Sequence, residues 1–338
     1  MQNLSISLKS AHMETKQILI TGLTGQDGRI LASKLLKEGH DVYGIVRKVV
    51  ERNKEYDMWD PFAETHIIDG DVRNVRLACC HKYDEVYHLA AQSHVGYSFT
   101  HPEETYDINF NGTVNMLLQT FTNNPQAHFY FAGTSEMYGL PKSVIQNEYT
   151  PFDPQSPYAI AKVAAYHTAL YYRKRGYFVA AGITMNHESE IRGEDFVTRK
   201  ITKGIAEYIK TGKHLYLGNP NATRDWGYAP DFVDGFIKSL RTEIADTFVF
   251  GTGEMHSVME FYKAAIDFAN ELPHNSKYPL TYDDVAVFNI PKNLRPLEAG
   301  GFCADYIRAK NILGWEPKTK FPYLVRLMML YDMGSHDR

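Results

Sequence analysis

The sequence predicts an α/β protein in which a doubly wound parallel sheet is followed by a smaller C-terminal α/β lobe. Three observations support this fold class. Short apolar runs alternate with helical patterns over the first half of the chain, a glycine-rich turn follows the first run, and long charged loops begin after about residue 186. Strands that alternate with helices form βαβ units, whose right-handed crossovers produce a parallel sheet that is covered on both faces.

The expected elements follow from residue type and spacing. Short runs of β-branched and aromatic residues indicate strands, and apolar residues that recur at helical spacing indicate helices. The expected strands are residues 17–21, 41–46, 65–68, 85–89, 128–131 and 178–184. The expected helices are residues 28–37, 104–122 and 157–173 in the first half, and residues 197–210, 231–240, 257–268 and 321–331 in the second.

Chain length and the change in pattern divide the sequence into three parts. Residues 1–16 are polar and are expected to form a flexible extension, because they lack the apolar stretch of a secretory signal. The first domain is expected at residues 17–185, and a segment around residues 219–241 is a candidate to return to it. The lobe is expected at residues 186–338, which suits a chain of 338 residues at roughly 100–200 residues per domain.

Composition narrows the possible functions. Apolar residues make up 44% and charged residues 22% of the chain, the balance of a folded soluble protein. The 36 basic and 40 acidic residues give a formal net charge of -4, which provides no general attraction to nucleic acid or to a membrane. Three cysteines are too few for a disulfide framework, so we expect reduced thiols in a cytoplasmic protein. The 14 histidines have no metal-ligand spacing, so we expect no metal site. No apolar run approaches the ~20 residues that a membrane-spanning helix needs.

A glycine motif follows the first expected strand and opens the first expected helix. It reads Gly22-Leu-Thr-Gly25-Gln-Asp-Gly28. Gly22 permits a tight turn, Gly25 lets the backbone approach a pyrophosphate, and Gly28 lets the helix pack on the strand. The free N–H groups of the helix N-terminus would face that pyrophosphate. A glycine-rich turn without a ligand is the alternative, but the strand, helix and second strand around the motif favour a Rossmann-like dinucleotide site.

Residues at the ends of the second and third strands bear on the choice of dinucleotide. Arg47-Lys48 stands where an acid would accept a hydrogen bond from the ribose 2′-OH of NAD. An arginine there suits a 2′-phosphate, so the sequence favours NADP, with a solvated basic pair as the alternative. Asp71 and Val72 follow the third strand and could contact the adenine, although an ordinary turn aspartate explains Asp71 nearly as well.

Two further motifs carry groups that can move protons. Tyr158 and Lys162 are four residues apart on an expected helix and therefore share a face. A nearby ammonium and an oxidised nicotinamide would stabilise the phenolate, which makes Tyr158 a candidate base. In an extended chain Thr134 and Glu136 would point the same way, where Thr134 could bond a sugar oxygen and Glu136 could take a carbon-bound proton. Each motif alone also fits a surface pair or an exposed turn acid.

Taken in order, these motifs resemble the extended short-chain dehydrogenase/reductase family: GxxGxxG, Leu89-Ala-Ala91, Thr134-Ser-Glu136 and Tyr158 with Lys162. Later segments are similar to the GDP-mannose 4,6-dehydratase family within it. These segments include Asn186-His-Glu-Ser189, Leu217-Gly-Asn219, Arg224-Asp-Trp-Gly227 and Arg295-Pro296. The resemblance covers about residues 16–331.

The resemblance implies a redox-neutral dehydration of GDP-mannose with NADP as cofactor. Tyr158 would remove the proton of the sugar 4-hydroxyl while hydride passes from C4 to NADP, and the new ketone would acidify the C5 hydrogen. Glu136 would take the C5 proton and help expel the C6 hydroxyl as water before hydride returns to C6. Thr134 would hold the C4 oxygen, and Lys162 would lower the pKa of Tyr158. A side reduction of the product to GDP-D-rhamnose is also compatible with the family.

The same resemblance implies which residues bind the two ligands. Arginines among them suit phosphate because a guanidinium binds phosphate in a bidentate way. A solvated loop is the alternative for Arg192, Arg199 and Lys200. The implied cofactor residues are Gly22, Thr24, Gly25, Gln26, Asp27, Gly28, Arg47, Asp71, Val72, Leu89, Ala90, Ala91, Gln92, Ser93, Tyr158, Lys162, His187 and Arg192. The implied substrate residues are Ser93, Asn186, Val197, Lys200, Arg224, Arg295 and Glu298.

The sequence departs from the family pattern at several positions near these ligands. Glu104 stands where the family commonly has Tyr, Gly133 replaces a more usual Ser, and Glu190-Ile191 replaces Pro-Arg. The segment after Arg47 lacks the usual Arg-Ser run, which bears on the 2′-phosphate contact. None of these changes removes a candidate catalytic residue.

The resemblance further implies a homodimer or homotetramer. Helices 104–122 and 157–173 form a dimer-making four-helix bundle in relatives, and Leu117, Ala165 and Leu170 are expected to face outward. The alternatives to a dehydratase are another NADP-dependent nucleotide-sugar enzyme (a UDP-sugar decarboxylase, a GDP-heptose dehydratase or a GDP-sugar 4-reductase) and a non-catalytic NADP-binding protein. Segments 186–189 and 224–227 favour a guanosine sugar, and the four candidate catalytic residues together favour an enzyme.

Overall fold

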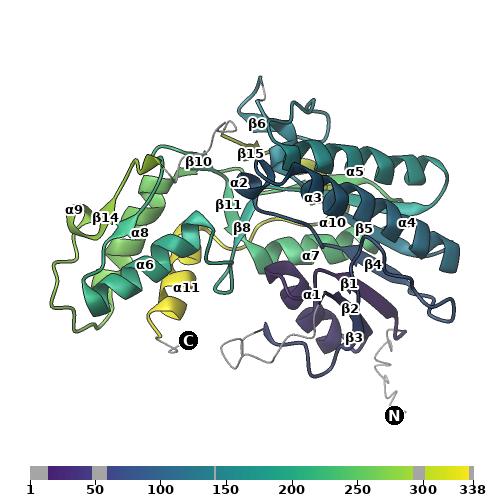
Figure 1. Ribbon diagram of the computed structural model, residues 1–338, viewed down its shortest axis with the longest axis horizontal. Coiled ribbons are helices and arrows are strands. Elements are labelled where there is room, and N and C mark those ends of the chain that lie inside the picture. The colour runs from purple at the N-terminus through teal and green to yellow at the C-terminus, as the bar shows by residue number, and fades with distance from the viewer. Residues whose placement is uncertain (1–13, 48–58, 141, 292–300, 335–338) are drawn as a thin grey trace, which may run out of the picture.

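A seven-stranded parallel sheet forms the centre of the protein in the computed structural model, which describes residues 14–47, 59–140, 142–291 and 301–334 (Figure 1). The strand order is β12-β7-β5-β4-β1-β2-β3, and each neighbouring pair is parallel. Strands are added outward from β1 and β4, which creates the switch point where doubly wound sheets bind ligands beyond the carboxyl ends of their strands. The strands are β1 (Gln17–Thr21), β2 (Asp41–Val46), β3 (His66–Asp69), β4 (Glu85–His88), β5 (His128–Thr134), β7 (Phe178–Thr184) and β12 (Thr247–Phe250).

Helices cover both faces of the sheet, because successive strand residues are apolar and point to opposite sides. Leu19 faces the layer with α4 and α5, whereas Ile18 and Ile20 face α1 and α7. This arrangement confirms the predicted doubly wound sheet. The elements of these layers are α1 (Gln26–Lys37), α2 (Val95–Ser98), α3 (Pro102–Tyr106), the π-helical turn η2 (Asp107–Asn111), α4 (Gly112–Asn123), the 3-10 helix η3 (Ser135–Tyr138), α5 (Pro157–Lys174), α7 (Ala229–Leu240), α10 (Ile307–Leu313) and the paired strands β6 (Ile145–Gln146) and β15 (Cys303–Ala304).

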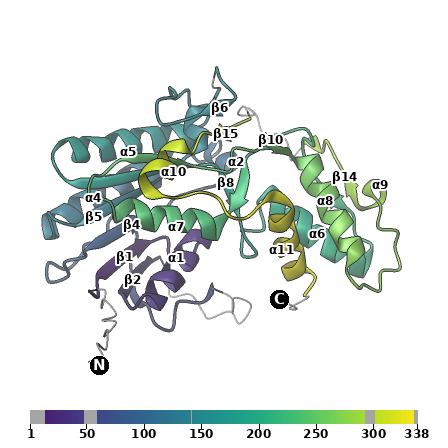
Figure 2. The ribbon, with the colours of Figure 1, turned by 180° about the vertical axis from the view of Figure 1, so that it is seen from behind.

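The smaller lobe lies beside the sheet, at the left of Figure 1 and at the right of Figure 2. Its helices α6, α8 and α11 pack around a third buried cluster that includes Ile205, Phe261 and Met328. Among the helices of the described segments, none combines the length and apolar character needed to cross a bilayer. The elements of the lobe are α6 (Val197–Thr211), α8 (Val258–Glu271), α9 (Tyr282–Val285), α11 (Phe321–Asp332) and three strand pairs: β8 (Asn186–Glu188) with β11 (Trp226–Tyr228), β9 (Leu215–Tyr216) with β14 (Ala286–Val287), and β10 (Thr223–Arg224) with β13 (His256–Ser257).

Most predicted elements have ends within a residue or two of those in the structure. Strand β5 runs three residues further than predicted, to Thr134, and the helix predicted at residues 104–122 divides into α3, η2 and α4. The prediction misses β12 and α10. Strand β12 pairs with β7, and α7 packs against α1, so the segment 186–338 contributes both to the sheet and to the lobe.

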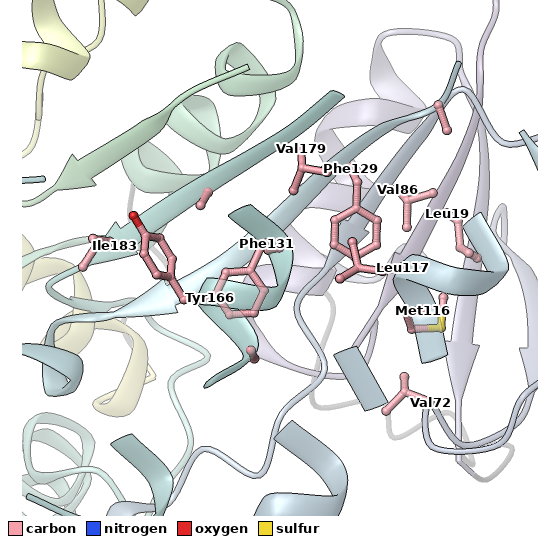
Figure 3. Packing of buried hydrophobic residues seen from close by; sticks show 14 of the residues in the cluster. Leu19, Val72, Val86, Met116, Leu117, Phe129, Phe131, Tyr166, Val179 and Ile183 are labelled. Carbon is pink, nitrogen blue, oxygen red and sulfur yellow. The ribbon is translucent and has the colours of Figure 1, made fainter. Parts of the chain in front are cut away.

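One expectation about the outer helices is wrong. Leu117 and Ala165 are predicted to face outward, but both are fully buried, and Leu170 is half-buried against the same cluster. Figure 3 shows the Leu117 side chain among the residues of the sheet. Because successive helix residues are about 100° apart around the axis, outward positions fall instead on residues such as Leu118 and Tyr171, which are 52% and 54% exposed.

Candidate active site

The glycine turn between β1 and α1 has the shape that a pyrophosphate requires. Gly22 has a φ of +75°, and a Cβ on it would lie 2.8 Å from the Ala90 backbone nitrogen. A Cβ on Gly28 would lie 2.3 Å from the Gly22 carbonyl oxygen, so a side chain there would force α1 away from the turn. Helix α1 begins after Gly25 without a side-chain cap, and Thr24 lies exposed in the turn. The N–H groups of the first helical turn are therefore suited to an anionic ligand, and the residues present fit a dinucleotide.

Polar side chains hold the segment after β4 beside this turn. The Ala90 N–H donates to Thr21 Oγ1 at 3.0 Å. Asn109 clamps Gln92 by two bonds, accepting from its N–H at 2.8 Å and donating to its carbonyl at 3.0 Å. Asn109 belongs to the π-helical turn η2, and sequence reasoning misses it, although a buried polar residue in an apolar helix pattern is a usable signal. The predicted cofactor residues of this clamped segment are Leu89, Ala90, Ala91, Gln92 and Ser93.

Asp27 and His187, which are both predicted to contact the cofactor, contact each other. His187 Nε2 lies 2.9 Å from Asp27 Oδ2, and Gln26 Nε2 donates to Asp27 Oδ1 at 3.1 Å. Burial alone would raise the pKa of Asp27, but the charge and hydrogen bond of His187 outweigh burial and lower it. The glycine turn is thereby connected to β8, which begins at the predicted substrate residue Asn186.

The candidate acid–base residues lie together at the carboxyl end of β5. The chain does not stay extended after Thr134, because η3 begins at Ser135, and the Glu136 N–H donates to Thr134 Oγ1 at 3.3 Å. Tyr158 lies in the first turn of α5, which Ser156 caps. The Tyr158 phenol makes a hydrogen bond with the Thr134 side chain and lies within electrostatic range of Glu136. A phenol and a carboxylate therefore share one site, through a tight turn rather than the expected extended chain.

Burial dominates the ionisation of the two candidate groups on α5. Burial raises the pKa of Tyr158 to about 12, although the hydrogen bond from Thr134 and the charge of Arg192 act in the opposite direction. Burial also lowers the pKa of Lys162 to about 7, and its Nζ lies 4.6 Å from the centre of the Phe131 ring. Lys162 is not among the groups that shift the pKa of Tyr158 here, so its predicted effect on that pKa stays a prediction.

Arg192 lies between the cofactor turn and the acid–base residues. Its guanidinium carbon is 3.6 Å from the centre of the Phe196 ring, and its Nε is 3.0 Å from Glu188 Oε2. Its charge acts on the pKa of Asp27 and also on that of Tyr158. The charge of Arg192 therefore acts both on the glycine turn and on the candidate acid–base residues.

The predicted adenosine contacts follow β2 and β3. Arg47 is exposed at the end of β2. Asp71 is held by Arg73 through two bonds of 2.9 Å, which lower the pKa of Asp71. Val72 is buried beside Gly112, so its side chain belongs to the core. Sequence reasoning misses Arg73, which no motif spacing distinguishes.

The predicted substrate residues come mainly from the lobe. Val197 begins α6, and the exposed Lys200 follows within one turn. Arg224 is buried in β10, where its Nη1 donates to the carbonyl of Thr223 at 2.7 Å. Arg295 and Glu298 lie outside the described residues.

The fold and this arrangement define the class of protein. A doubly wound parallel sheet, a glycine turn at its switch point and a Tyr–Lys pair on the helix after β5 are the features of a short-chain dehydrogenase/reductase. Among solved structures, the NAD-dependent NDP-hexosamine 5,6-dehydratase TunA of tunicamycin biosynthesis matches with a TM-score of 0.79 and 22% identity, covering 94% of this chain and 97% of that one. At this identity the likeness concerns the fold alone.

Sequence comparison gives the particular family. Residues 19–328 match the family model for GDP-mannose 4,6 dehydratase. GDP-mannose 4,6 dehydratase 2 of Caenorhabditis elegans is 37% identical over 346 residues, which cover 96% of this chain and 91% of the relative. GDP-mannose 4,6-dehydratase of Vibrio cholerae is 38% identical over 357 residues, which cover 96% of this chain and 95% of the relative. The chain belongs to the GDP-mannose 4,6-dehydratase family.

Proposed function

We propose that the protein is an NADP-dependent GDP-mannose 4,6-dehydratase, a hydro-lyase that converts GDP-D-mannose into GDP-4-dehydro-6-deoxy-D-mannose and water. The observation that carries this proposal is the meeting of Tyr158, Thr134 and Glu136 at the carboxyl end of β5. A 4-epimerase needs the tyrosine but has no use for a carboxylate near C5 and C6, whereas elimination of water needs an acid–base group there. Membership of the family supports GDP-mannose as the substrate.

Tyr158 and Thr134 would act at the C4 oxygen of the sugar. NADP, when bound, would supply reversible hydride transfer. Tyr158 would accept the proton of the 4-hydroxyl, and Thr134 would hold the same oxygen. Because burial holds the pKa of Tyr158 at about 12, the phenol needs a positive charge nearby before it becomes a base near neutral pH. Lys162 can provide this charge only while it is protonated, and its pKa of about 7 places that condition near neutrality.

Glu136 would act at C5 and C6 of the sugar. The turn at η3 places its carboxylate within electrostatic range of the Tyr158 phenol. We expect a sugar with its 4-hydroxyl at Tyr158 to extend C5 and C6 toward Glu136. The carboxylate would take the C5 proton, which the C4 ketone makes acidic, and deliver a proton to the departing C6 hydroxyl.

Cofactor type, location and assembly complete the proposal. The exposed Arg47 at the end of β2 supports NADP, because its guanidinium suits a 2′-phosphate. Free thiols at Cys79, Cys80 and Cys303 support a reducing, cytoplasmic location. The exposed apolar residues of α4 and α5 support a homodimer or a homotetramer.

The proposal is tested by turnover. The protein is incubated with GDP-mannose and NADP, and the 4-keto-6-deoxy product is detected by its absorbance in alkali. UDP-glucuronate and GDP-heptose are supplied in parallel. If either of these sugars turns over faster than GDP-mannose, that sugar becomes the assigned substrate. If cofactor-loaded protein turns over none of them, the proposed enzyme activity is contradicted.

Glu136→Gln tests the elimination step. We expect the Kd of GDP-mannose to change little, because the amide is nearly isosteric, and product formation to fall by about 10²–10⁴-fold, the usual contribution of an acid–base group. Glu103→Gln is the matched control, since Glu103 is exposed on α3, and it should leave turnover unchanged. Normal product formation by Glu136→Gln would remove Glu136 from the mechanism.

A further inference from the structure

His187 faces two hydrogen-bond acceptors at once. Its Nδ1 lies 2.8 Å from the Met185 carbonyl oxygen, and its Nε2 lies 2.9 Å from Asp27 Oδ2. A carbonyl oxygen can only accept, so Nδ1 must carry a hydrogen, and the contact between Nε2 and the carboxylate then requires one more proton. Gln26 donates to the other oxygen of Asp27 at 3.1 Å, as it would to a carboxylate. This geometry requires two protons on the pair. Because the pKa of Asp27 is lowered and that of His187 is raised, both protons lie on the imidazole, and the pair is an imidazolium with a carboxylate.

The surroundings of His187 also favour the protonated, positively charged form of its ring. Phe232 on α7 stacks on the imidazole, with 4.8 Å between ring centres and 20° between planes, and Phe236 lies edge-on at 6.3 Å. The face of an aromatic ring attracts a cation. Burial alone would lower the pKa of His187, but the charge and hydrogen bond of Asp27 outweigh burial and raise it above its ordinary value.

Further hydrogen bonds, made by Gln26, connect the glycine turn to the start of the lobe. Gln26 Nε2 donates to the His187 carbonyl at 3.1 Å, and Ser189 Oγ donates to Gln26 Oε1 at 2.7 Å. Strand β8, which contains His187, pairs with β11 of the lobe. The first turn of α1 is therefore held from residues 187–189, and the Asp27–His187 pair supplies the charged part of that connection.

We propose that His187 is a positioning residue whose positive charge makes the glycine turn suitable for an anionic dinucleotide, so that loss of its proton weakens cofactor binding. The inference rests on the proposed function, which requires NADP. Asp27 lies in the first turn of α1, where a pyrophosphate would approach the helix N-terminus. With His187 charged, the pair is neutral overall. With His187 neutral, the carboxylate repels the pyrophosphate and the turn loses its charged bond to β8.

Other titratable groups face this pair, and the experiment has to separate them. Arg192 acts on both members of the pair, but its own charge is balanced by Glu188 at 3.0 Å. Tyr130 on β5 faces Asp27, and burial raises its pKa well above the ordinary value, so it stays neutral. Lys162, with a pKa of about 7, titrates in the range of interest.

The test compares the wild-type protein with Asp27→Asn. The asparagine amide can donate to a neutral His187 Nε2, so the variant keeps the contact without the second proton. The Kd of NADP+ is measured by calorimetry for both proteins from about pH 6 to about pH 10. His187 loses its proton as the pH rises through its raised pKa, so the ratio of wild-type to variant Kd should increase about tenfold over this range. Lys162 and the cofactor phosphates titrate in both proteins and cancel in the ratio.

Protonation of His187 is measured directly by the nitrogen chemical shifts of its ring, assigned with a His187→Gln variant. At pH 7 the cofactor-free wild type should show a doubly protonated ring, and Asp27→Asn should show a neutral one. A neutral ring in the wild type, or a Kd ratio that does not change with pH, would overturn the proposal. If Asp27→Asn does not fold, the wild-type protein decides alone: its Kd for NADP+ must rise over the same pH range in which the spectrum shows His187 losing its second proton. Neither measurement involves turnover, so failure here is distinct from failure of the dehydratase assay.

Discussion

The ionisation of the buried His88 on β4 depends on its surroundings, which include Lys162 on α5. Burial, reinforced by the charge of Lys162, lowers the pKa of His88 to about 3, so His88 is neutral. Thr113 Oγ1 donates to the Asn109 carbonyl at 2.7 Å, so His88 Nε2 donates to Thr113 at 3.0 Å. Nδ1 is then left to accept from Thr21 Oγ1 at 2.9 Å. The spacing of Lys162 from Tyr158 could be found in the sequence, but its ionisation could not, because burial between α5 and the sheet sets it.

Replacing Lys162 by Met should stabilise the cofactor-free protein, most strongly at low pH. The pKa of Lys162 is 10.5 in the unfolded chain and about 7 in the folded protein, so the buried ammonium destabilises the fold. This destabilisation is complete at a pH below about 7, and it disappears as the pH rises to 10.5. We expect the free energy of unfolding in urea to increase by about 2–4 kcal/mol near pH 6 and hardly at all near pH 10. Lys318→Met is the control, because that side chain is 75% exposed. A gain independent of pH would contradict the assigned desolvation of Lys162.

At the scale of elements, the predictable features are those set by local pattern. Strands at residues 17–21, 41–46 and 178–184 have the predicted ends, because apolar runs bounded by polar residues or glycine define them. The break in the helix predicted at residues 104–122 is not local, since η2 is fixed by the bonds of Asn109 to Gln92 in another segment. Strand β12 has only four residues, and its pairing with β7 makes it part of the sheet.

Asp225 connects its own segment with two other backbone segments. It lies between β10 and β11, is 1% exposed, and accepts bonds from the backbone N–H groups of Thr252, Gly253 and Ala304 at 2.8 to 3.0 Å. Burial raises the pKa of Asp225. Both carboxylate oxygens accept from N–H groups, whereas an asparagine would turn its own NH2 group toward some of these donors. Asp225→Asn should therefore lower the free energy of unfolding by about 2–4 kcal/mol.

Urea denaturation measures this loss, with Asp41→Asn as the control, since Asp41 is exposed at the start of β2. The control should change the stability by less than about 0.5 kcal/mol. Equal stability of the two variants would show that the carboxylate of Asp225 does not organise these loops.

At the scale of the whole molecule, the proposed site joins elements that are far apart in the chain. Thr134 ends β5, Tyr158 lies in the first turn of α5, and His187 lies in β8. The order of the motifs predicts that these segments meet, because parallel crossovers bring the carboxyl ends of the strands to one edge. The direct pairing of Asp27 with His187 was not predictable, because it depends on how the start of the lobe lies against α1.

The outer layer of α4 and α5 is where we expect two copies of the chain to meet. These helices lie side by side on the sheet face opposite α1 and α7 (Figure 1), and Leu118 and Tyr171 are 52% and 54% exposed on them. A stable interface of about 1,200–2,000 Å² would remove such side chains from water. The double variant Leu118→Glu with Tyr171→Glu should halve the sedimenting mass, because each copy would then bury unpaired carboxylates at the contact. Ile244→Glu, at a residue that is 78% exposed after α7, should keep the wild-type mass. A monomeric wild type would contradict the assembly, and a double variant of wild-type mass would place the interface elsewhere.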